Sequence, residues 1–346
     1  MNQWIALVLV VLIATSGNAQ ELDDLFRQNK DEPGCVVGYA RDGEVEYLKG
    51  FGSANLEHSI PITPQTRFHV ASVSKQFTGV AIGLLILEGK LSLADDVRRH
   101  LPEFPDYGHP ITIDHLLQHR SGLQNHSKLM RPDDLLDYGN STSQQEALNL
   151  VFEQKLNFRP GEKFEYSSGY LVLAKIVENV SGLPFRVFAE QRLFKPLGMK
   201  HSGIHDDFSI IPNRAEGYLR DGDRWINDRV RYTLVGSGGV HSTAGDLLIW
   251  SHALRHDKLA PGLSKLLFES PAEARTEDTS YHFGLTRAEY RNQPTFGHSG
   301  SFQASRTTLY NFEPGMTTII ACNHRIDTEQ LTWKLLAKIA PPNRDK

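Results

Sequence analysis

Residues 68–89 read FHVASVSKQFTGVAIGLLILEG and join a start of small residues to a long apolar run. Apolar side chains recur in this run at helical spacing, namely Phe77, Val80, Ala81, Leu84 and Leu85. This spacing places them on one helix face, and Gly89 is a typical helix stop. The segment therefore predicts a helix over residues 72–88, and its density of apolar residues predicts that the helix is buried.

The start of this helix carries a Ser-x-x-Lys motif that runs from Ser72 to Lys75. Residues three apart lie on the same helix face, so the lysine amine can lie beside the serine hydroxyl. A lysine in a semi-buried site beside other cations can lose its proton and act as a base. Backbone N–H groups at a helix N-terminus also point toward an incoming carbonyl oxygen. The motif is short enough to occur about once by chance in such a chain, and a capping serine with a solvated lysine is the alternative.

β-Rich segments lie at both ends of the chain. Residues 34–52 predict a hairpin, because two β-rich runs flank Asp42-Gly43, a dipeptide favoured in two-residue turns. Strands resume after Thr295. The elements predicted there are strands over residues 298–310 and 317–322, a turn at Glu313-Pro314-Gly315, and a last helix over about residues 328–339.

Between these ends, residues 91–234 have mostly helical and loop patterns, with helices predicted over 169–180 and 185–193. Strands at both ends and helices between them predict an α+β fold, in which an antiparallel sheet built from both chain ends is flanked by helices. The corresponding domain prediction is a discontinuous sheet domain, residues 20–90 and 235–346, with residues 91–234 inserted as a mainly helical region.

The N-terminal segment has the composition of an export signal. Trp4 to Ala14 is an unbroken run of eleven apolar residues, too short for a bilayer span but suited to a signal-peptide core. Small residues at Gly17 and Ala19 predict cleavage after Ala19. We therefore expect a signal peptide over residues 1–19, no stable membrane span, and a periplasmic or secreted protein. Residues 1–3 carry no Lys or Arg, which leaves an uncleaved membrane anchor as the alternative.

The charge and the histidine spacing argue against two classes of partner. The formal net charge is −4 with no long run of one sign, so no nucleic-acid partner is expected. The 15 histidines include no His-Glu-x-x-His motif, and two cysteines alone cannot build a structural zinc site, so no metal is expected. No sequence feature indicates an oligomeric state.

Cys35 and Cys322 are the two cysteines, and both lie in β-like segments. They can form a disulfide in an oxidising compartment if the two strands are neighbours. Two buried free thiols are the alternative.

Two further segments carry residues that can do chemistry. In Tyr166-Ser167-Ser168, a tyrosine near a lysine and a serine can transfer protons, although packing is the more ordinary role of such a tyrosine. In Gly297-His298-Ser299-Gly300-Ser301, a glycine inside a strand often marks the close approach of a ligand or another backbone. Ser299 can donate to a substrate carboxylate or carbonyl, and the N–H near Ser301 can form half of an oxyanion hole. A bulge or a tight turn is the alternative.

In chain order, these three motifs resemble those of the serine β-lactamase superfamily, which includes class C β-lactamases, D-alanyl-D-alanine carboxypeptidases, D-aminopeptidases and esterases. The resemblance covers about residues 33–337 and extends to four further segments: Phe68–Ser72, Leu116–Leu123, Leu193–Met199 and Gly238–Leu247. It implies a β-lactamase/transpeptidase-like fold and an acyl-enzyme mechanism that needs no cofactor.

The resemblance also implies roles for individual residues. Ser72 would attack the substrate carbonyl while Lys75 and Tyr166 move its proton. The backbone N–H groups of Ser72 and Ser301 would hold the oxyanion. His298-Ser299-Gly300 stands where many relatives carry Lys-Thr-Gly, and a histidine there is a weaker anchor for a carboxylate at neutral pH.

The chain departs from the family pattern after Tyr166. Relatives usually carry Tyr-x-Asn, whereas Ser168 stands here and the segment is one residue shorter. In relatives the asparagine amide bonds both the lysine and the substrate amide, and a serine hydroxyl offers one donor instead of two. We therefore expect weakened amide and lactam chemistry, with ester hydrolysis least affected.

The sequence predicts a serine hydrolase that acts on a small peptide, amide or ester, D-Ala peptidase-like or esterase-like ahead of true β-lactamase activity. The first alternative is a catalytically weak or inactive relative that binds a cell-wall peptide or a protein partner; the second is a membrane-anchored structural protein. Selectivity is expected in loops within about residues 120–150 and 200–235. Further residues that could line the cleft are Arg120, His126, Tyr138 and Arg231.

Overall fold

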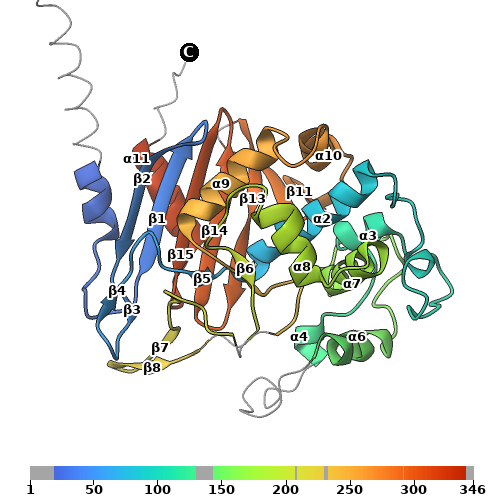
Figure 1. Cartoon of the computed structure of the whole chain (residues 1–346), viewed down its shortest axis with the longest axis horizontal. Coiled ribbons are helices and arrows are strands. Elements are labelled where there is room, and N and C mark those ends of the chain that lie inside the picture. The colour runs from blue at the N-terminus through green and yellow to red at the C-terminus, as the bar shows by residue number, and fades with distance from the viewer. Residues whose placement is uncertain (1–18, 130–142, 207–208, 230–232, 291, 340–346) are drawn as a thin grey trace, which may run out of the picture.

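The computed structural model describes residues 19–129, 143–206, 209–229, 233–290 and 292–339 (Figure 1). Tyr138 and Arg231, two of the predicted cleft residues, and the predicted signal peptide up to residue 18 lie outside this part of the chain. Within the described residues, no helix has the length and apolar character that a membrane span requires.

The centre of the fold is an eight-stranded antiparallel sheet in the order β10-β11-β12-β13-β14-β15-β1-β2. Its strands are β1 (Cys35–Arg41), β2 (Glu44–Phe51), β10 (Ala274–Thr276), β11 (Thr279–His282), β12 (Leu285–Tyr290), β13 (Gln293–Phe302), β14 (Ser305–Phe312) and β15 (Met316–Cys322). The order joins the two chain ends at the β1–β15 pair, which confirms the predicted α+β class and the sheet built from both ends.

Shorter strands and the helices surround this sheet. The small sheets consist of β3 (Ser53–Asn55) with β4 (Ile60–Pro61), β5 (Phe68–His69) with β9 (Val240–Ser242) and β6 (Gly203–Ile204), and β7 (Tyr218–Asp221) with β8 (Arg224–Asn227). The helices are α2 (Lys75–Leu87), α3 (Ile113–Leu117), α4 (His126–Leu129), α6 (Gln144–Phe152), α7 (Gly169–Ser181), α8 (Phe185–Ala189), α9 (Ala244–Arg255), α10 (Leu263–Glu269) and α11 (Thr328–Ile339). Residues 19–26 form a further helix.

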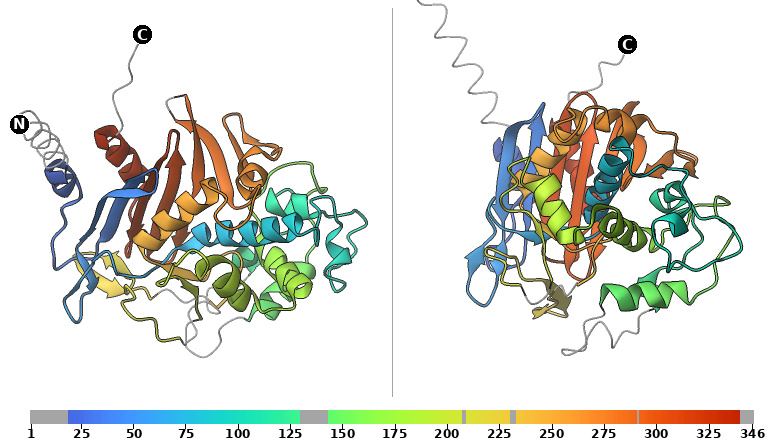
Figure 2. Two further views of the ribbon diagram at one scale, coloured as in Figure 1. Left: turned by 45° about the horizontal axis from the view of Figure 1, so that its top comes forward. Right: turned by 45° about the vertical axis from the view of Figure 1, so that its right-hand side comes forward.

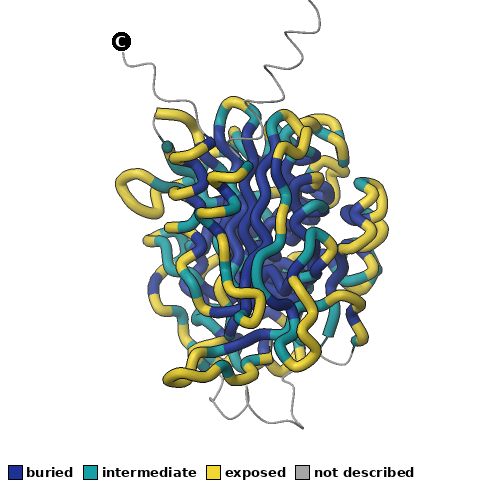
Figure 3. Tube along the Cα trace, turned by 90° about the vertical axis from the view of Figure 1, so that its left-hand side faces the viewer, coloured by how far each residue is buried: buried dark blue, intermediate teal, exposed yellow. Residues whose placement is uncertain are grey.

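The sheet packs between two layers of helices (Figure 2). On one face, α11 and helix 19–26 cover a small apolar cluster that includes Leu22, Val37, Ile320 and Leu336. On the other face, α2, α7 and α9 share a large core with inward-facing sheet residues such as Leu309. The central strands are consequently buried on both sides, as Figure 3 shows.

The β1–β2 hairpin forms where the sequence predicts it. Asp42 and Gly43 have positive φ angles of 48° and 88°, as the two central residues of a tight hairpin turn require. The predicted start of the C-terminal strands was too late, because the sheet already includes Ala274. Strands β10 to β12 are short and carry several exposed or half-exposed polar residues, so they lack the apolar run that marks a buried strand.

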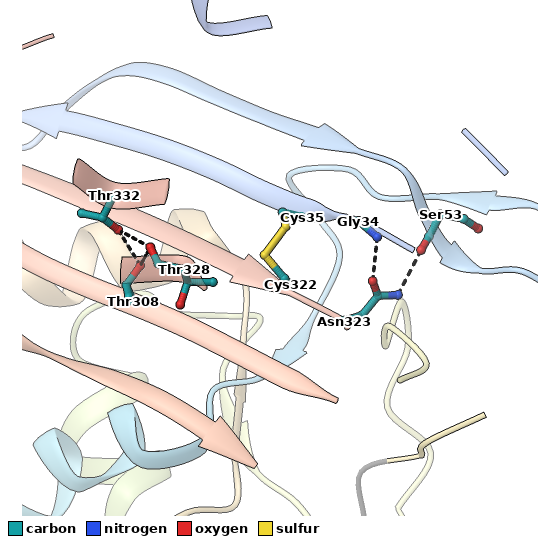
Figure 4. The surroundings of a disulfide bond; sticks show 8 residues. All are labelled: Gly34, Cys35, Ser53, Thr308, Cys322, Asn323, Thr328 and Thr332. Atoms are coloured by element: carbon teal, nitrogen blue, oxygen red, sulfur yellow. Dashed lines mark hydrogen bonds between the residues drawn. A yellow bond between two sulfur atoms is a disulfide. The ribbon is translucent and has the colours of Figure 1, made fainter. Parts of the chain in front are cut away.

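A disulfide joins Cys35 to Cys322 and settles the question that the sequence left open. The two residues face each other in the β1–β15 register, with their Cα atoms 4.1 Å apart. Next to them, Asn323 accepts a hydrogen bond from the Gly34 N–H at 2.8 Å and donates one to the Ser53 carbonyl at 3.0 Å (Figure 4). These contacts fix the point at which the two ends of the chain meet.

Helix α2 lies inside the large core, as predicted for a segment of this composition. Its first turn, Ala71–Ser74, is 3₁₀-helical, and Gly89 follows its end with a φ of 70°. Phe77 packs against Trp250 of α9 with the two rings tilted and their centroids 4.2 Å apart. The first turn of the helix in turn contacts β13, and this contact places Ser72 next to Gly300.

Candidate active site

Ser72 and Lys75 meet at the start of α2. The Lys75 Nζ donates to the Ser72 Oγ at 3.3 Å and to the Ser237 carbonyl at 2.8 Å. The lysine is only 3% exposed, and burial lowers the pKa of its ammonium from the usual value to about 7. Neutral Lys75 is therefore accessible near pH 7, and in that form it can take a proton from Ser72.

The residue before Ser72 has an unusual backbone. Ala71 has a φ of +47°, in the left-handed region that side chains other than glycine rarely adopt. The His69 Nδ1 accepts the Ala71 N–H at 3.3 Å, which helps to hold this conformation. The turn leaves Ser72 half-buried while its neighbours Val73 and Ser74 are buried, so its hydroxyl is reachable from solvent.

Tyr166 packs its ring against the amine of Lys75, which also contacts Ser72. The Lys75 Nζ lies 4.8 Å from the centroid of the Tyr166 ring. The His119 ring packs on the same tyrosine with centroids 4.3 Å apart, and His119 Nδ1 accepts the Ser167 N–H at 3.2 Å. His119, which the sequence did not single out, therefore positions the Tyr166 segment.

Strand β13 approaches Ser72 closely at Gly300. A Cβ added to Gly300 would lie 2.4 Å from the Val70 carbonyl oxygen and 3.2 Å from the Ser72 nitrogen. Only glycine allows this approach, which is the reason the sequence suggested for a glycine in this strand. The last residue pair between β12 and β13 is Thr286 with Gly297. From His298 onward, no described strand pairs with the edge of β13 that faces β12.

His298 is a neutral, structural member of the site. It is buried, its Nε2 hydrogen-bonds to the Tyr281 hydroxyl at 2.9 Å, and its Nδ1 contacts the Ser299 carbonyl. Burial, and next the charge of Lys75, lowers the pKa of the imidazole to about 3. His298 therefore carries no charge at neutral pH with which to bind a carboxylate.

A groove of about 490 Å³ opens over these residues. Of the predicted site residues, Ser72, Tyr166, His298, Ser299 and Ser301 line it. Its far part is lined by Tyr290, Tyr310, Glu329 and Trp333. Lys75 lies behind Ser72, and Gly300 packs on the backbone of Ser72. The structure therefore brings seven of the eight predicted site residues together, all except Ser168.

Arg275 is a groove residue that the sequence did not indicate. Its guanidinium lies over the Phe164 ring, 5.1 Å from the centroid, and donates to the Thr286 hydroxyl at 3.3 Å. No carboxylate pairs with it among the described residues, and it is the only Lys or Arg among the described residues lining the groove. Strand β10, which carries it, has no buried residue and so gave no sequence signal.

The Beta-lactamase family model matches residues 22–339 of the chain. The chain belongs to the Beta-lactamase family. A penicillin-binding protein of Bacillus subtilis (strain 168) is 30% identical over 334 residues, which cover 90% of this chain and 72% of the relative. Membership of this family supports a serine hydrolase-type activity.

Two solved structures show the same fold. One is the D-amino acid amidase from Ochrobactrum anthropi SV3 in complex with L-phenylalanine amide, with a TM-score of 0.79, 22% identity, and coverage of 94% of this chain and 98% of that chain. The other is EstCE1, a hydrolase with promiscuous acyltransferase activity, with a TM-score of 0.77, 22% identity, and coverage of 94% and 97%.

Ser168 is the residue at which the sequence departs from the Tyr-x-Asn pattern. This residue is fully buried and does not line the groove. Its hydroxyl is held by the backbone N–H of His126 at 2.7 Å and lies 3.0 Å from the His126 Nδ1. Ser168 therefore lies behind the site, and His126, a predicted cleft residue, holds it there and does not line the groove either. Arg120 donates to the Gly161 carbonyl and is not a groove residue.

Proposed function

We propose that the chain is an exported serine hydrolase that acts on a peptide, amide or ester through an acyl-enzyme on Ser72. The observation that carries the proposal is the contact of 3.3 Å between the Ser72 hydroxyl and the buried Lys75 amine, at one end of an open groove. A lysine whose pKa is about 7 can act as a base at neutral pH, whereas an ordinary lysine is fully protonated there.

The proposed reaction has two halves. Ser72 Oγ bonds to the substrate carbonyl carbon while its proton moves to Lys75, and the oxyanion is held by the backbone N–H groups of Ser72 and Ser301. The carbon–leaving-group bond then breaks, and the leaving group takes the proton by way of Tyr166. Water attacks the acyl-enzyme in the same manner and releases Ser72. Each oxyanion donor is worth roughly 10²- to 10³-fold in rate.

One charge of the groove, that of Arg275, is suited to a substrate carboxylate, although Glu289 and Glu329 line the groove as well. His298 is neutral, so the charge that many relatives place at this position is missing. Arg275 lines the same groove without a carboxylate partner among the described residues, and it can bind a carboxylate in two parallel hydrogen bonds. An arginine in this place supports a D-Ala peptidase-like substrate, and the rank of peptidase-like and esterase-like roles ahead of β-lactamase activity rests on the departure after Tyr166.

Export is supported by the Cys35–Cys322 disulfide, since such bonds persist in oxidising compartments. The apolar N-terminal run supports it as well.

The experiment that tests the proposal is intact-mass measurement after incubation with a fluorophosphonate and, separately, with a penicillin. Ser72→Ala is the control. We expect a single fluorophosphonate adduct that is absent from the variant, and a penicillin adduct would favour the cell-wall peptide role over the esterase role. If neither reagent labels folded protein, the alternative holds: a catalytically inactive relative that binds a cell-wall peptide or a protein partner.

A further inference from the structure

The part of the groove away from Ser72 lies beside helix α11. This helix packs on β14 and β15, where the Thr332 hydroxyl lies 2.8 Å from that of Thr308. The neighbouring strands β12 and β13 line the groove with small side chains, among them Ala288 and Ser299. A helix beside such small side chains leaves a channel, and α11 forms one wall of it.

Three aromatic rings form a shelf on this wall. The Trp333 ring lies 5.0 Å from the Tyr290 ring with their planes 21° apart, and 6.3 Å from the Tyr310 ring with their planes 23° apart. All three residues line the groove, and Trp333 is 40% exposed. The rings support one another, so their positions are largely set before a ligand enters. This aromatic shelf therefore offers an electron-rich, accessible surface.

A carboxylate lies beside the aromatic shelf. Glu329 lines the groove, and its Oε1 accepts a hydrogen bond from the Tyr310 hydroxyl at 3.2 Å. None of the described Lys and Arg side chains forms a salt bridge with it. Glu329 precedes Trp333 by four residues on α11, so the two side chains are neighbours on one helix face. Electron-rich rings and a carboxylate both attract a cation and both disfavour an anion.

Tyr166 indicates which half of the substrate faces the aromatic shelf. In the proposed reaction this tyrosine passes a proton to the leaving group, and its ring lies 6.3 Å from that of His298. Ser301, a proposed oxyanion donor, lies three residues further along β13. Tyr310 pairs with Gly297, which is on the His298 side of this donor. The leaving group therefore departs toward the aromatic shelf.

The aromatic shelf is also within reach of Ser72. Gly300 packs on the Ser72 backbone, and the hydroxyl of the adjacent Ser299 interacts with that of Tyr310. The Tyr310 hydroxyl in turn contacts Glu329. A leaving group with a chain of about five carbons, which spans roughly the length of two extended residues, can follow this path.

We propose that the aromatic shelf and Glu329 bind a positively charged amine on the leaving group of the substrate. The substrate class is then an ester, thioester or amide whose leaving group carries an ammonium several bonds from the scissile bond. A basic amino acid is one such leaving group, since Arg275 can hold its carboxylate. The proposal rests on the proposed function, because the leaving group is the one that Ser72 displaces.

The test compares two thioesters that share a phenylacetyl group, one with a 5-ammoniopentyl thiol and one with a hexyl thiol. The two chains have equal length and differ only in ending with an ammonium or a methyl group. The charge is five carbons from the sulfur, so the two thiols are similar as leaving groups. We expect the intact protein to prefer the ammonium thioester in kcat/KM, measured by release of thiol.

Two variants remove the two attractions separately. Glu329→Gln keeps the size of the side chain and removes its charge, and Trp333→Leu keeps an apolar side chain and removes the ring. Each should lower the preference for the ammonium thioester by about two- to fivefold, with turnover of the hexyl thioester little changed in Glu329→Gln. Glu44→Gln is the matched control, because Glu44 is an exposed carboxylate on β2, at the far edge of the sheet. It should leave the preference unchanged.

Fluorophosphonate labelling of Ser72 distinguishes failure of this proposal from failure of the proposed function. If the wild-type protein is not labelled, the proposed function fails and this proposal fails with it. If labelled protein shows no preference for the ammonium thioester or turns over neither thioester, this proposal is overturned and the proposed function stands. A preference that survives in Glu329→Gln and in Trp333→Leu also overturns it. An equal loss on both thioesters in Trp333→Leu, with no change in Glu329→Gln, shows an apolar contact only and overturns the assignment of a cation.

Discussion

The two sides of the groove near Ser72 are built on different principles. Ser72 and Lys75 lie one turn apart at the start of α2, so local helix geometry brings them together. Tyr166, Ser167 and Ser168 precede α7 and lie outside regular structure, and contacts from His119 and His126 hold two of them. The first side depends mainly on one packed helix, and the second on two side chains, His119 and His126, that come from a distant part of the chain. We therefore expect substitution of Lys75 to leave the protein folded. Substitution of His119 or His126 should lower its stability more.

The largest expected effect belongs to Lys75→Met. Methionine has a similar length and no charge, so it removes the base and also the cost of burying an ammonium in this site. We expect kcat/KM for a neutral ester to fall by about 10²- to 10⁴-fold, while Tm stays the same or rises. Steady-state kinetics and thermal unfolding check both. A large fall in Tm would show that Lys75 supports the helix as much as the chemistry.

The pH dependence tests the same side of the groove without a mutation. Lys75 must be neutral to accept the Ser72 proton, so lowering the pH through its pKa of about 7 removes the active form. We expect kcat/KM to be level above pH 8 and to fall about tenfold per unit below pH 7. His126 and His298 have pKa values of about 4 and 3, so neither contributes to this limb.

A profile for a neutral ester, measured from pH 5 to pH 9, decides the point. A rate that stays level down to pH 5 would exclude Lys75 as the base. A His126→Gln variant is the control, because the pKa of His126 is about 4 and its loss should leave this limb where it lies in the wild-type protein.

A smaller effect is expected at His119, on the second side. His119 is fully buried with a φ of +55°, so alanine there leaves the Ser167 N–H unpaired, opens a cavity and strains the backbone. We expect the free energy of unfolding to fall by about 2–4 kcal/mol and kcat by about tenfold through displacement of Tyr166. His119→Asn, which tolerates positive φ and keeps an acceptor, should lose less of both.

Urea unfolding and turnover of one ester measure these changes. If His119→Ala lowers stability while kcat stays unchanged, then Tyr166 is held by its other neighbours and the contrast between the two sides does not hold.

The same contrast explains which features the sequence predicted. The β1–β2 hairpin, α2, and α11 over 328–339 follow from turn dipeptides and local periodicity, and they lie where expected. The relation between Ser72 and Lys75 follows from a spacing of three residues on a helix. That the Tyr166 and His298 motifs belong to the same site as Ser72 was predicted from the family resemblance.

Features that depend on distant contacts were not predictable in this way. Arg275 enters the groove through the pairing of β10 with β11, two strands without a strong apolar pattern. The burial of Ser168 depends on His126, which is 42 residues away along the chain. A motif read along the chain shows which residue types are present, but such contacts determine which of them face the substrate.

The smallest expected effect on turnover belongs to the disulfide, which joins the two chain ends outside the groove. The double substitution Cys35→Ser and Cys322→Ser removes a link between residues 287 apart, and we expect the free energy of unfolding to fall by about 2–5 kcal/mol. We expect kcat/KM at 25 °C to stay within about twofold, because the β1–β15 pairing and the Asn323 contacts remain to hold the sheet. Urea unfolding of the oxidised protein and of the variant, with turnover measured on both, checks the two parts. A fall in turnover equal to that of His119→Ala would mean that the meeting point of the chain ends positions Ser72 as strongly as the nearby histidine positions Tyr166.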